Sequence, residues 1–177
     1  MTSEKYREAY VWVWLPEETK PVVAGRLETD NGITVFNYGR SYLERVADKP
    51  QAIPIYLPEL PLQPGVLPLV QGLTIPGCIR DAAPDAWGRR VIINKLTGAV
   101  TNIDPGNFDE LTFLLESGSD RIGALDFQHS PTDYEARTSH NVTMDELIES
   151  ADRIEKGIPL NTEICLLYTS PSPRDRG

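Results

Sequence analysis

A stretch near the middle of the chain, DAAPDAWGRR (Asp81 to Arg90), gathers residue types that often carry chemistry. Its two carboxylates could transfer a proton, and its two adjacent arginines could grip a phosphate or a carboxylate. The spacing also fits the start of a helix, because Pro84 suits the first helical position, where no N–H is needed. Asp81 could cap the free first-turn amides, and Asp85 would lie at the positive end of the helix dipole. We therefore expect these residues to have a structural role at a helix start.

The residues after this start predict a helix that packs on one side. Its apolar stripe consists of Trp87, Val91, Ile92 and Leu96, and Gly98 follows where a helix-ending glycine is expected. Gly88 lowers helix propensity by roughly 1 kcal/mol relative to alanine. A glycine beside a tryptophan therefore indicates close approach of another backbone or side chain.

The two arginines leave two interpretations open. Arg89 lies four residues after Asp85, the favourable order for an ion pair worth about 0.3–0.5 kcal/mol. A packing helix alone accounts for most of the stretch. Trp87, Arg89 and Arg90 could in addition contact a carboxylate-rich neighbouring domain or an acidic partner, so they are candidate interface residues.

Other stretches of the sequence lack the complete motifs of catalytic and metal sites. GSDRIGAL (Gly118 to Leu125) has the two glycines of a Walker A loop, but Ala124 and Leu125 stand where lysine and a hydroxyl residue are needed. Gly123 is better explained by a tight turn. The sequence has no GxGxxG or GxSxG motif, and its two histidines and two cysteines lack metal-ligand spacing. We expect no catalytic, cofactor-binding or metal-binding residue in this chain.

Composition narrows the class of partner. The chain has 177 residues, 40% hydrophobic and 24% charged, with a formal net charge of −9. This acidity disfavours direct binding to nucleic acid or to an anionic membrane. No apolar run approaches the roughly 20 residues of a membrane span, and the N-terminus does not resemble a signal peptide. We expect a cytoplasmic protein with reduced thiols.

The N-terminal third predicts an antiparallel meander. Strands are expected over Ala9–Leu15, Pro21–Glu28 and Ile33–Tyr38, and Asn31-Gly32 is a strong signal for a tight turn. The first strand alternates between two apolar faces, so it should be covered on both sides or use one side for contact.

The rest of the chain mixes helices with one more strand. Helices are expected over Ser41–Ala47, capped by Ser41, over Phe108–Glu116, and from a capping box at Thr143 to Lys156, with a strand over Arg121–Gln128. Seven prolines between Pro50 and Pro76 predict an ordered extended connection, with a possible edge strand at IPIYLP. The fold class is therefore α+β: a small antiparallel β-sheet with packed helices.

Several motifs in order resemble the HipA-like family, the toxin kinases of type II toxin–antitoxin modules. DAAPDAWGRR is the most specific of these motifs. The others are VWVW with VAGRL, FNY with SYL, the LPL-like passage from Ile55 to Leu62, and SGSDRIGALDF. Extra prolines make the LPL-like passage a weaker match. Together they cover roughly Tyr10 to Ile164. The resemblance implies a Ser/Thr protein kinase that uses ATP and Mg²⁺ and is neutralised by a DNA-binding antitoxin.

The resemblance places this chain at the N-terminal part of such a kinase. It implies an N-terminal subdomain over residues 8–130 and a helical connector over 131–164. The family's glycine-rich loop and catalytic aspartates would follow, but residues 165–177 are instead expected to be a non-native, adapter-like tail or a disordered one. We thus expect a catalytically incomplete fragment whose partners are the antitoxin and the missing kinase body. The alternative is a stand-alone interaction module that pairs with a separately encoded kinase body or antitoxin.

Overall fold

The computed structural model describes residues 6–45, 51–97, 104–120 and 123–137, together with 148–149, 152–153, 156 and 158. The chain divides into two compact units. The sheet unit contains residues 5–82 and 123–135, and the helical unit contains residues 1–4, 83–122 and 136–177. Each unit is described by itself below.

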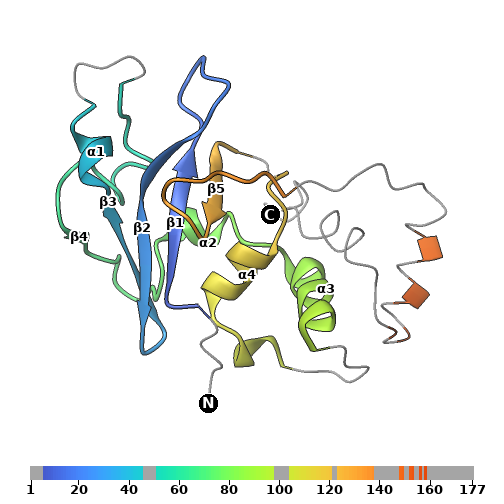
Figure 1. Ribbon diagram of the computed structural model, residues 1–177. Coiled ribbons are helices and arrows are strands. Elements are labelled where there is room, and N and C mark those ends of the chain that lie inside the picture. The colour runs from blue at the N-terminus through green and yellow to red at the C-terminus, as the bar shows by residue number, and fades with distance from the viewer. Residues whose placement is uncertain are drawn as a thin grey trace. The chain divides into compact units, whose positions relative to one another are not determined.

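The sheet unit is built on a five-stranded antiparallel sheet (Figure 1). Its order is β4-β3-β2-β1-β5, with bounds β1 Glu8–Val13, β2 Val22–Asp30, β3 Ile33–Tyr38, β4 Val66–Leu67 and β5 Leu125–Gln128. Asn31 and Gly32 turn the chain between β2 and β3 with φ angles of 50° and 77°, as the Asn-Gly signal predicted. The predicted α+β class and antiparallel meander are confirmed.

One face of the sheet forms the core of this unit. Strand register aligns two rows of buried side chains, Ala9–Leu27–Phe36–Leu67 and Phe127–Val11–Gly25–Tyr38. All are nearly inaccessible to solvent. The alternation of strand residues produces this face, because every second side chain points to the same side. The Phe36 and Tyr38 rings meet edge to face at 4.9 Å.

Strand β1 is also covered near its end on its tryptophan side. Trp12 and Trp14 each contact the ring of Tyr134, with centroid distances of 5.4 Å. The Trp12 indole donates a hydrogen bond from Nε1 to the Ser130 carbonyl at 3.1 Å. The register of β1 shifts between Val11 and Trp12, which marks an irregularity in the ladder. The two apolar faces predicted for this strand are therefore both in contact with protein.

Two tyrosine hydroxyls hold the proline-rich connection on the sheet. Tyr38 donates to the Leu60 carbonyl at 2.8 Å and accepts from the Ile55 N–H at 2.9 Å. Tyr42 donates to the Ile53 carbonyl at 2.8 Å, and its ring stacks on Tyr38 at 5.6 Å. Side-chain hydrogen bonds thus help to hold the connection, together with the backbone pairing of its residues Val66 and Leu67.

Two details of this region differ from the sequence-based expectation. Helix α1 spans Arg40–Leu43 and begins at Gly39 without a side-chain cap, so the predicted capping by Ser41 is wrong. The helix ends at Leu43 with Glu44 as its C-cap, so the predicted extension to Ala47 is also wrong. The edge strand forms at Val66–Leu67, whereas IPIYLP contributes only an isolated bridge between Tyr56 and Leu60.

A half-buried carboxylate links the same connection to helix α2 (Gly77–Arg80). Glu59 accepts from the N–H groups of Gly77 at 2.6 Å and Cys78 at 3.2 Å. These first-turn amides have no partner within the helix, so the carboxylate satisfies both. Glu59 is the single charged residue between Gln51 and Pro76, and it is used for this contact.

The helical unit contains α3 (Ala86–Thr97), a short 3₁₀ turn η1 (Pro105–Asn107) and α4 (Glu110–Glu116). Asp109 caps α4, because its Oδ1 accepts from the Thr112 N–H at 2.7 Å. The predicted helix from Thr143 to Lys156 and the tail at 165–177 fall largely or wholly outside the described residues. None of the helices in the described part of the chain is long and apolar enough to cross a membrane.

Candidate functional site

The start of α3 is set by Asp85. Its Oδ1 accepts from the Gly88 N–H at 2.8 Å, and its carbonyl accepts from the Arg89 N–H at 2.9 Å. Asp85 is therefore the capping residue, and the helix begins at Ala86. The prediction that Pro84 is the first helical residue is wrong, because Pro84 precedes the cap and the Asp85 side chain takes the capping position.

Asp81 has a different role from the one expected. It is the residue that ends α2, where its N–H donates to the Gly77 carbonyl at 2.9 Å. Its carboxylate lies 3.8 Å from the Arg80 guanidinium. The capping predicted for Asp81 is carried out by Asp85, which is closer in sequence to the free amides of α3.

Arg89 joins α3 to α4. Its Nη1 and Nη2 atoms donate to the two carboxylate oxygens of Glu110 at 2.9 and 2.8 Å. Its Nε donates to the Pro84 carbonyl at 3.1 Å, and its guanidinium carbon lies 4.5 Å from the centre of the Phe113 ring. The predicted pairing with Asp85 does not form, since Asp85 is engaged in the cap and Glu110 offers bidentate geometry.

A second ion pair and an apolar cluster complete this junction. Lys95 pairs with Glu116 at 3.2 Å, so the two helices are joined near both of their ends. Between the pairs lie Ile92, Ile93 and Phe113, with Leu96 and Phe108 packed against them. We call the set of Arg89, Glu110, Lys95 and Glu116 with this cluster the helix junction. Fixed charged pairs around an apolar centre make it a rigid element.

The remaining residues of the predicted interface differ in exposure. Trp87 is half-buried and engaged in a contact, Gly88 is buried, and Arg90 is exposed. Arg90 makes no ion pair or hydrogen bond within the part of the chain that the structure describes. Arg89 is committed to Glu110 inside its own unit, so Arg90 is the more accessible of the two arginines. The interface role and the close approach at Gly88 stay predictions.

The Walker-like stretch has the geometry of a turn. Gly123 has φ +128°, and β5 begins at Leu125, so the stretch leads into a strand and not into a helix. The Ser119 N–H, which a phosphate loop would direct at its ligand, donates instead to the Arg137 carbonyl at 2.8 Å. The positive φ of Gly123 agrees with a turn, but Arg121 and Ile122 lie outside the described residues, so the tight turn stays a prediction.

Among the described residues, the cysteine, histidine and carboxylate side chains are not arranged for nucleophilic attack or for metal binding. Burial raises the pKa of the Cys78 thiol to about 12, and the neighbouring Glu59 carboxylate adds to the increase. Such a thiol is protonated at neutral pH and is a poor nucleophile. His129 is exposed and its ring lies 5.0 Å from that of Tyr6. Within the described ranges, no three His, Cys, Asp or Glu side chains converge as metal ligands. His140 and Cys165 lie outside those ranges.

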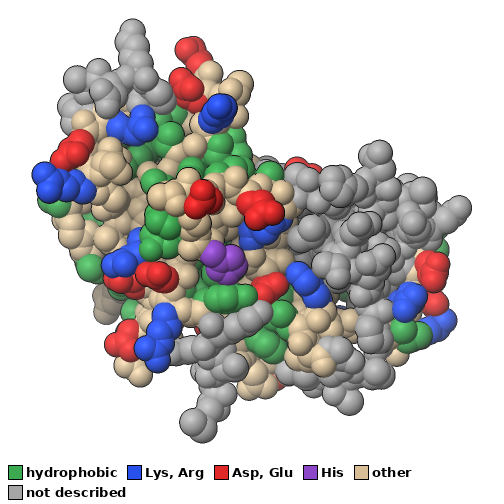
Figure 2. Space-filling model, viewed as in Figure 1, with side chains coloured by type: hydrophobic (Ala, Val, Ile, Leu, Met, Phe, Trp, Pro, Cys, Tyr) green, Lys and Arg blue, Asp and Glu red, His purple; other side chains and the backbone are tan. Residues whose placement is uncertain are grey.

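The surface in view has mixed charge. Figure 2 shows acidic and basic side chains next to one another, with hydrophobic side chains between them. Neighbouring charges of opposite sign weaken the field that either would exert at a distance. A partner would therefore recognise this surface through contacts with individual residues rather than through a long-range electric field.

The comparisons with known proteins give one match. The family model described as the HipA N-terminal domain matches residues 12–128. The match begins within β1, includes the whole helix junction and ends at the last residue of β5. No curated protein and no solved structure matches the chain.

Proposed function

Because this chain belongs to the HipA N-terminal domain family, we propose that it is the N-terminal subdomain of a HipA-like Ser/Thr protein kinase from a type II toxin–antitoxin module. The single observation that carries the proposal is the family match over about two thirds of the chain. In this proposal the protein acts in the cytoplasm, and a DNA-binding antitoxin neutralises it.

The described residues of the Walker-like stretch do not fit ATP and Mg²⁺. Ala124 and Leu125 occupy the positions where a phosphate loop needs lysine and a hydroxyl, and the Ser119 N–H is already used by Arg137. Among the described residues, no carboxylate cluster could hold a metal ion. In this proposal phosphoryl transfer belongs to a kinase body, and this chain contributes binding surfaces to it.

The helix junction supports a contact role for Arg90. Arg89 and Lys95 fix α3 against α4, and the exposed Arg90 side chain is carried by this rigid helix. Its planar guanidinium can make two parallel hydrogen bonds to a single carboxylate. We assign to Arg90, with the half-buried Trp87, the contact with an acidic surface of the kinase body.

Extending the gene in its source DNA tests the proposal. A reading frame that continues beyond residue 164 into a glycine-rich loop and kinase aspartates supports the fragment hypothesis. A neighbouring gene that encodes the kinase body separately supports the alternative of a stand-alone module. A locus with neither feature would refute both.

Binding measurements test the assigned roles directly. The 177-residue chain should give no heat on titration with Mg²⁺–ATP, and micromolar binding would contradict the exclusion of a phosphate loop. Arg90→Glu should weaken capture of the co-expressed kinase body. Arg40→Glu, at a side chain that is 92% exposed in the sheet unit, is the matched control and should not.

A further inference from the structure

The face of the sheet opposite the core has a defined composition. Strand register aligns one row of Val66, Asn37, Arg26 and Tyr10, a second row of Val35, Glu28 and Glu8, and a third pair of Ile33 and Asp30. These residues alternate with the buried ones along each strand, so they share the other face. We call this set the open face.

The two sides of the open face differ in polarity. The side formed by β3 and β4 has Asn37 as its polar member and is otherwise aliphatic, and it includes Ile33 and Val66, which are 50% and 60% exposed. The side formed by β1 and β2 carries the three carboxylates of Glu8, Glu28 and Asp30. An aliphatic strip thus lies directly beside an acidic strip.

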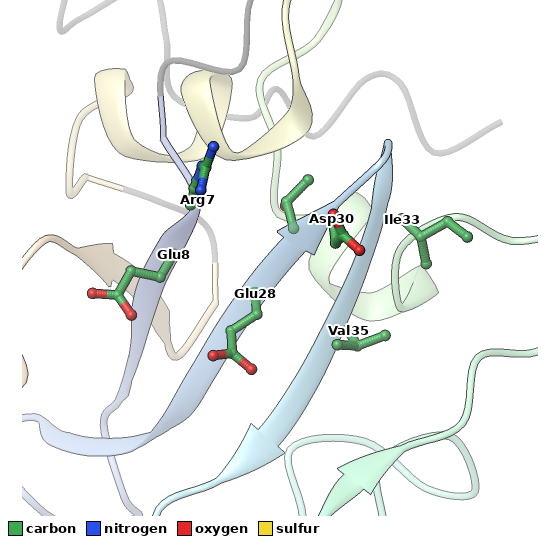
Figure 3. A pocket seen from close by; sticks show the side chains of 7 residues that line it. Arg7, Glu8, Glu28, Asp30, Ile33 and Val35 are labelled. Atoms are coloured by element: carbon green, nitrogen blue, oxygen red, sulfur yellow. The ribbon is translucent and has the colours of Figure 1, made fainter.

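The acidic strip has an excess of negative charge. Arg26 is the one cation on it, and its guanidinium is shared between Glu8 at 3.3 Å and Glu28 at 2.5 Å. Figure 3 shows Arg7 directed away from Glu8 and Glu28, although it also lines the hollow beside them. With Arg7 included, three carboxylates and two guanidiniums still leave a net charge of −1 here, in a chain of net charge −9.

The open face is hollowed. A hollow of about 520 Å³ is lined by Arg7, Glu8, Glu28, Thr29, Asp30, Ile33 and Val35, so both strips border it (Figure 3). Three spacings of about 4.8 Å separate β4 from β1 at the row of Val66, and two separate β3 from β1 at the row of Val35, so the face is about 10–14 Å wide. This width accommodates one helix with its side chains, about 10–12 Å across.

From this composition we propose that the open face binds a basic, amphipathic helical segment of a partner protein. Its aliphatic side chains would lie on Ile33, Val35 and Val66, and its lysines or arginines would reach Glu8, Glu28 and Asp30. The aliphatic stems of such cations also suit a boundary between an apolar and an acidic strip. Nucleic acid and anionic lipid carry the wrong charge for this face. The inference does not depend on the proposed kinase function.

Peptide binding to the full chain tests the proposal. The probe is a short, fluorescently labelled leucine–lysine peptide patterned as an amphipathic helix, and anisotropy reports its binding. The wild-type chain should bind this peptide and should not bind a leucine–glutamate peptide of the same pattern. The double variant Glu8→Gln/Glu28→Gln should bind about five-fold more weakly, because exposed ion pairs each contribute a modest amount.

Matched variants separate the face from general charge effects. Glu17→Gln/Glu18→Gln removes two exposed carboxylates from the β1–β2 loop and should leave affinity within about two-fold of wild type. Val66→Thr should weaken binding without changing charge, and Asp30→Asn provides a second acidic test if the double variant folds poorly. Equal loss in the Glu17/Glu18 control, unchanged binding by the Glu8/Glu28 or Asp30 variants, or equal binding of the leucine–glutamate peptide would overturn the proposal.

Discussion

Gly25 on β2 allows the sheet to pack against its own aromatic side chain. A Cβ atom added there would lie 2.6 Å from Cζ of Phe36 and 2.3 Å from the Asn37 carbonyl oxygen. The Phe36 ring is fully buried, and Asn37 belongs to the β3 backbone that pairs with β2, so neither can move without disturbing the sheet. Overpacking of this kind costs about 1–3 kcal/mol. We expect Gly25→Ala to reach the upper end, about 3 kcal/mol.

Thermal and urea unfolding followed by circular dichroism measure this loss. For a chain of this length about 3 kcal/mol corresponds to a decrease in Tm of about 10 °C. Gly39→Ala is the control, because its Cβ would meet the Ala24 carbonyl oxygen at 3.7 Å in an ordinary contact, and Gly39 has φ −66°. The control should change stability by about 1 kcal/mol or less. Equal effects of the two substitutions would refute the role assigned to Phe36 and Asn37.

Three further predictions concern charge and protonation. Arg89→Lys should lower the free energy of unfolding in urea by about 1–2 kcal/mol, because lysine cannot make the bidentate pair with Glu110. Arg90→Ala is the control and should change it by no more than about 0.5 kcal/mol. Equal losses in the two variants would contradict the stabilising role assigned to Arg89 in the helix junction. In a Cys165→Ser background, Cys78 should react with a thiol-specific disulfide reagent at pH 8 only after unfolding. The reason is that burial raises the pKa of its thiol to about 12, so little thiolate is present. Rapid reaction of the native protein would show that the Cys78 thiolate is accessible and would contradict this prediction. Burial also raises the pKa of Tyr38 to about 12, so the folded pKa values of both groups exceed their ordinary values of 9.0 and 10.0. The contribution of both groups to stability is therefore complete below pH 9 and is lost as pH rises from about 9 to 12. The urea midpoint of unfolding should fall over this interval, and it should fall less steeply in Cys78→Ala. A midpoint that does not change with pH would refute the raised pKa values of Cys78 and Tyr38.

The first three strands could be predicted because their signals are local. Alternation of apolar residues fixed which side chains share a face, and Asn31-Gly32 tolerates the positive φ angles of the turn. The bounds of β3 agree with the prediction at both ends. The DAAPDAWGRR stretch was also correctly placed at a helix start.

The exact first residue of that helix could not be predicted from the sequence. Pro84 and Asp85 are both favourable near a helix N-terminus, and the sequence does not decide which defines it. The structure places Asp85 at the cap, because its carboxylate reaches the Gly88 N–H. The helix therefore starts two residues later than predicted, at Ala86, and Arg89 pairs with Glu110 because Asp85 is engaged in the cap.

The sequence by itself determined the class of fold, the meander, the turn at Asn31-Gly32 and the family, since each depends on short-range patterns or ordered motifs. Only the tertiary structure decided that Arg89 pairs with Glu110, 21 positions away, and that Glu59 caps α2, 18 positions away. It also decided that β5 pairs with β1, and that aliphatic and acidic strips lie together on the open face. Many carboxylates in an acidic chain could pair with a given arginine, and the backbone path selects the one that reaches it with the right geometry.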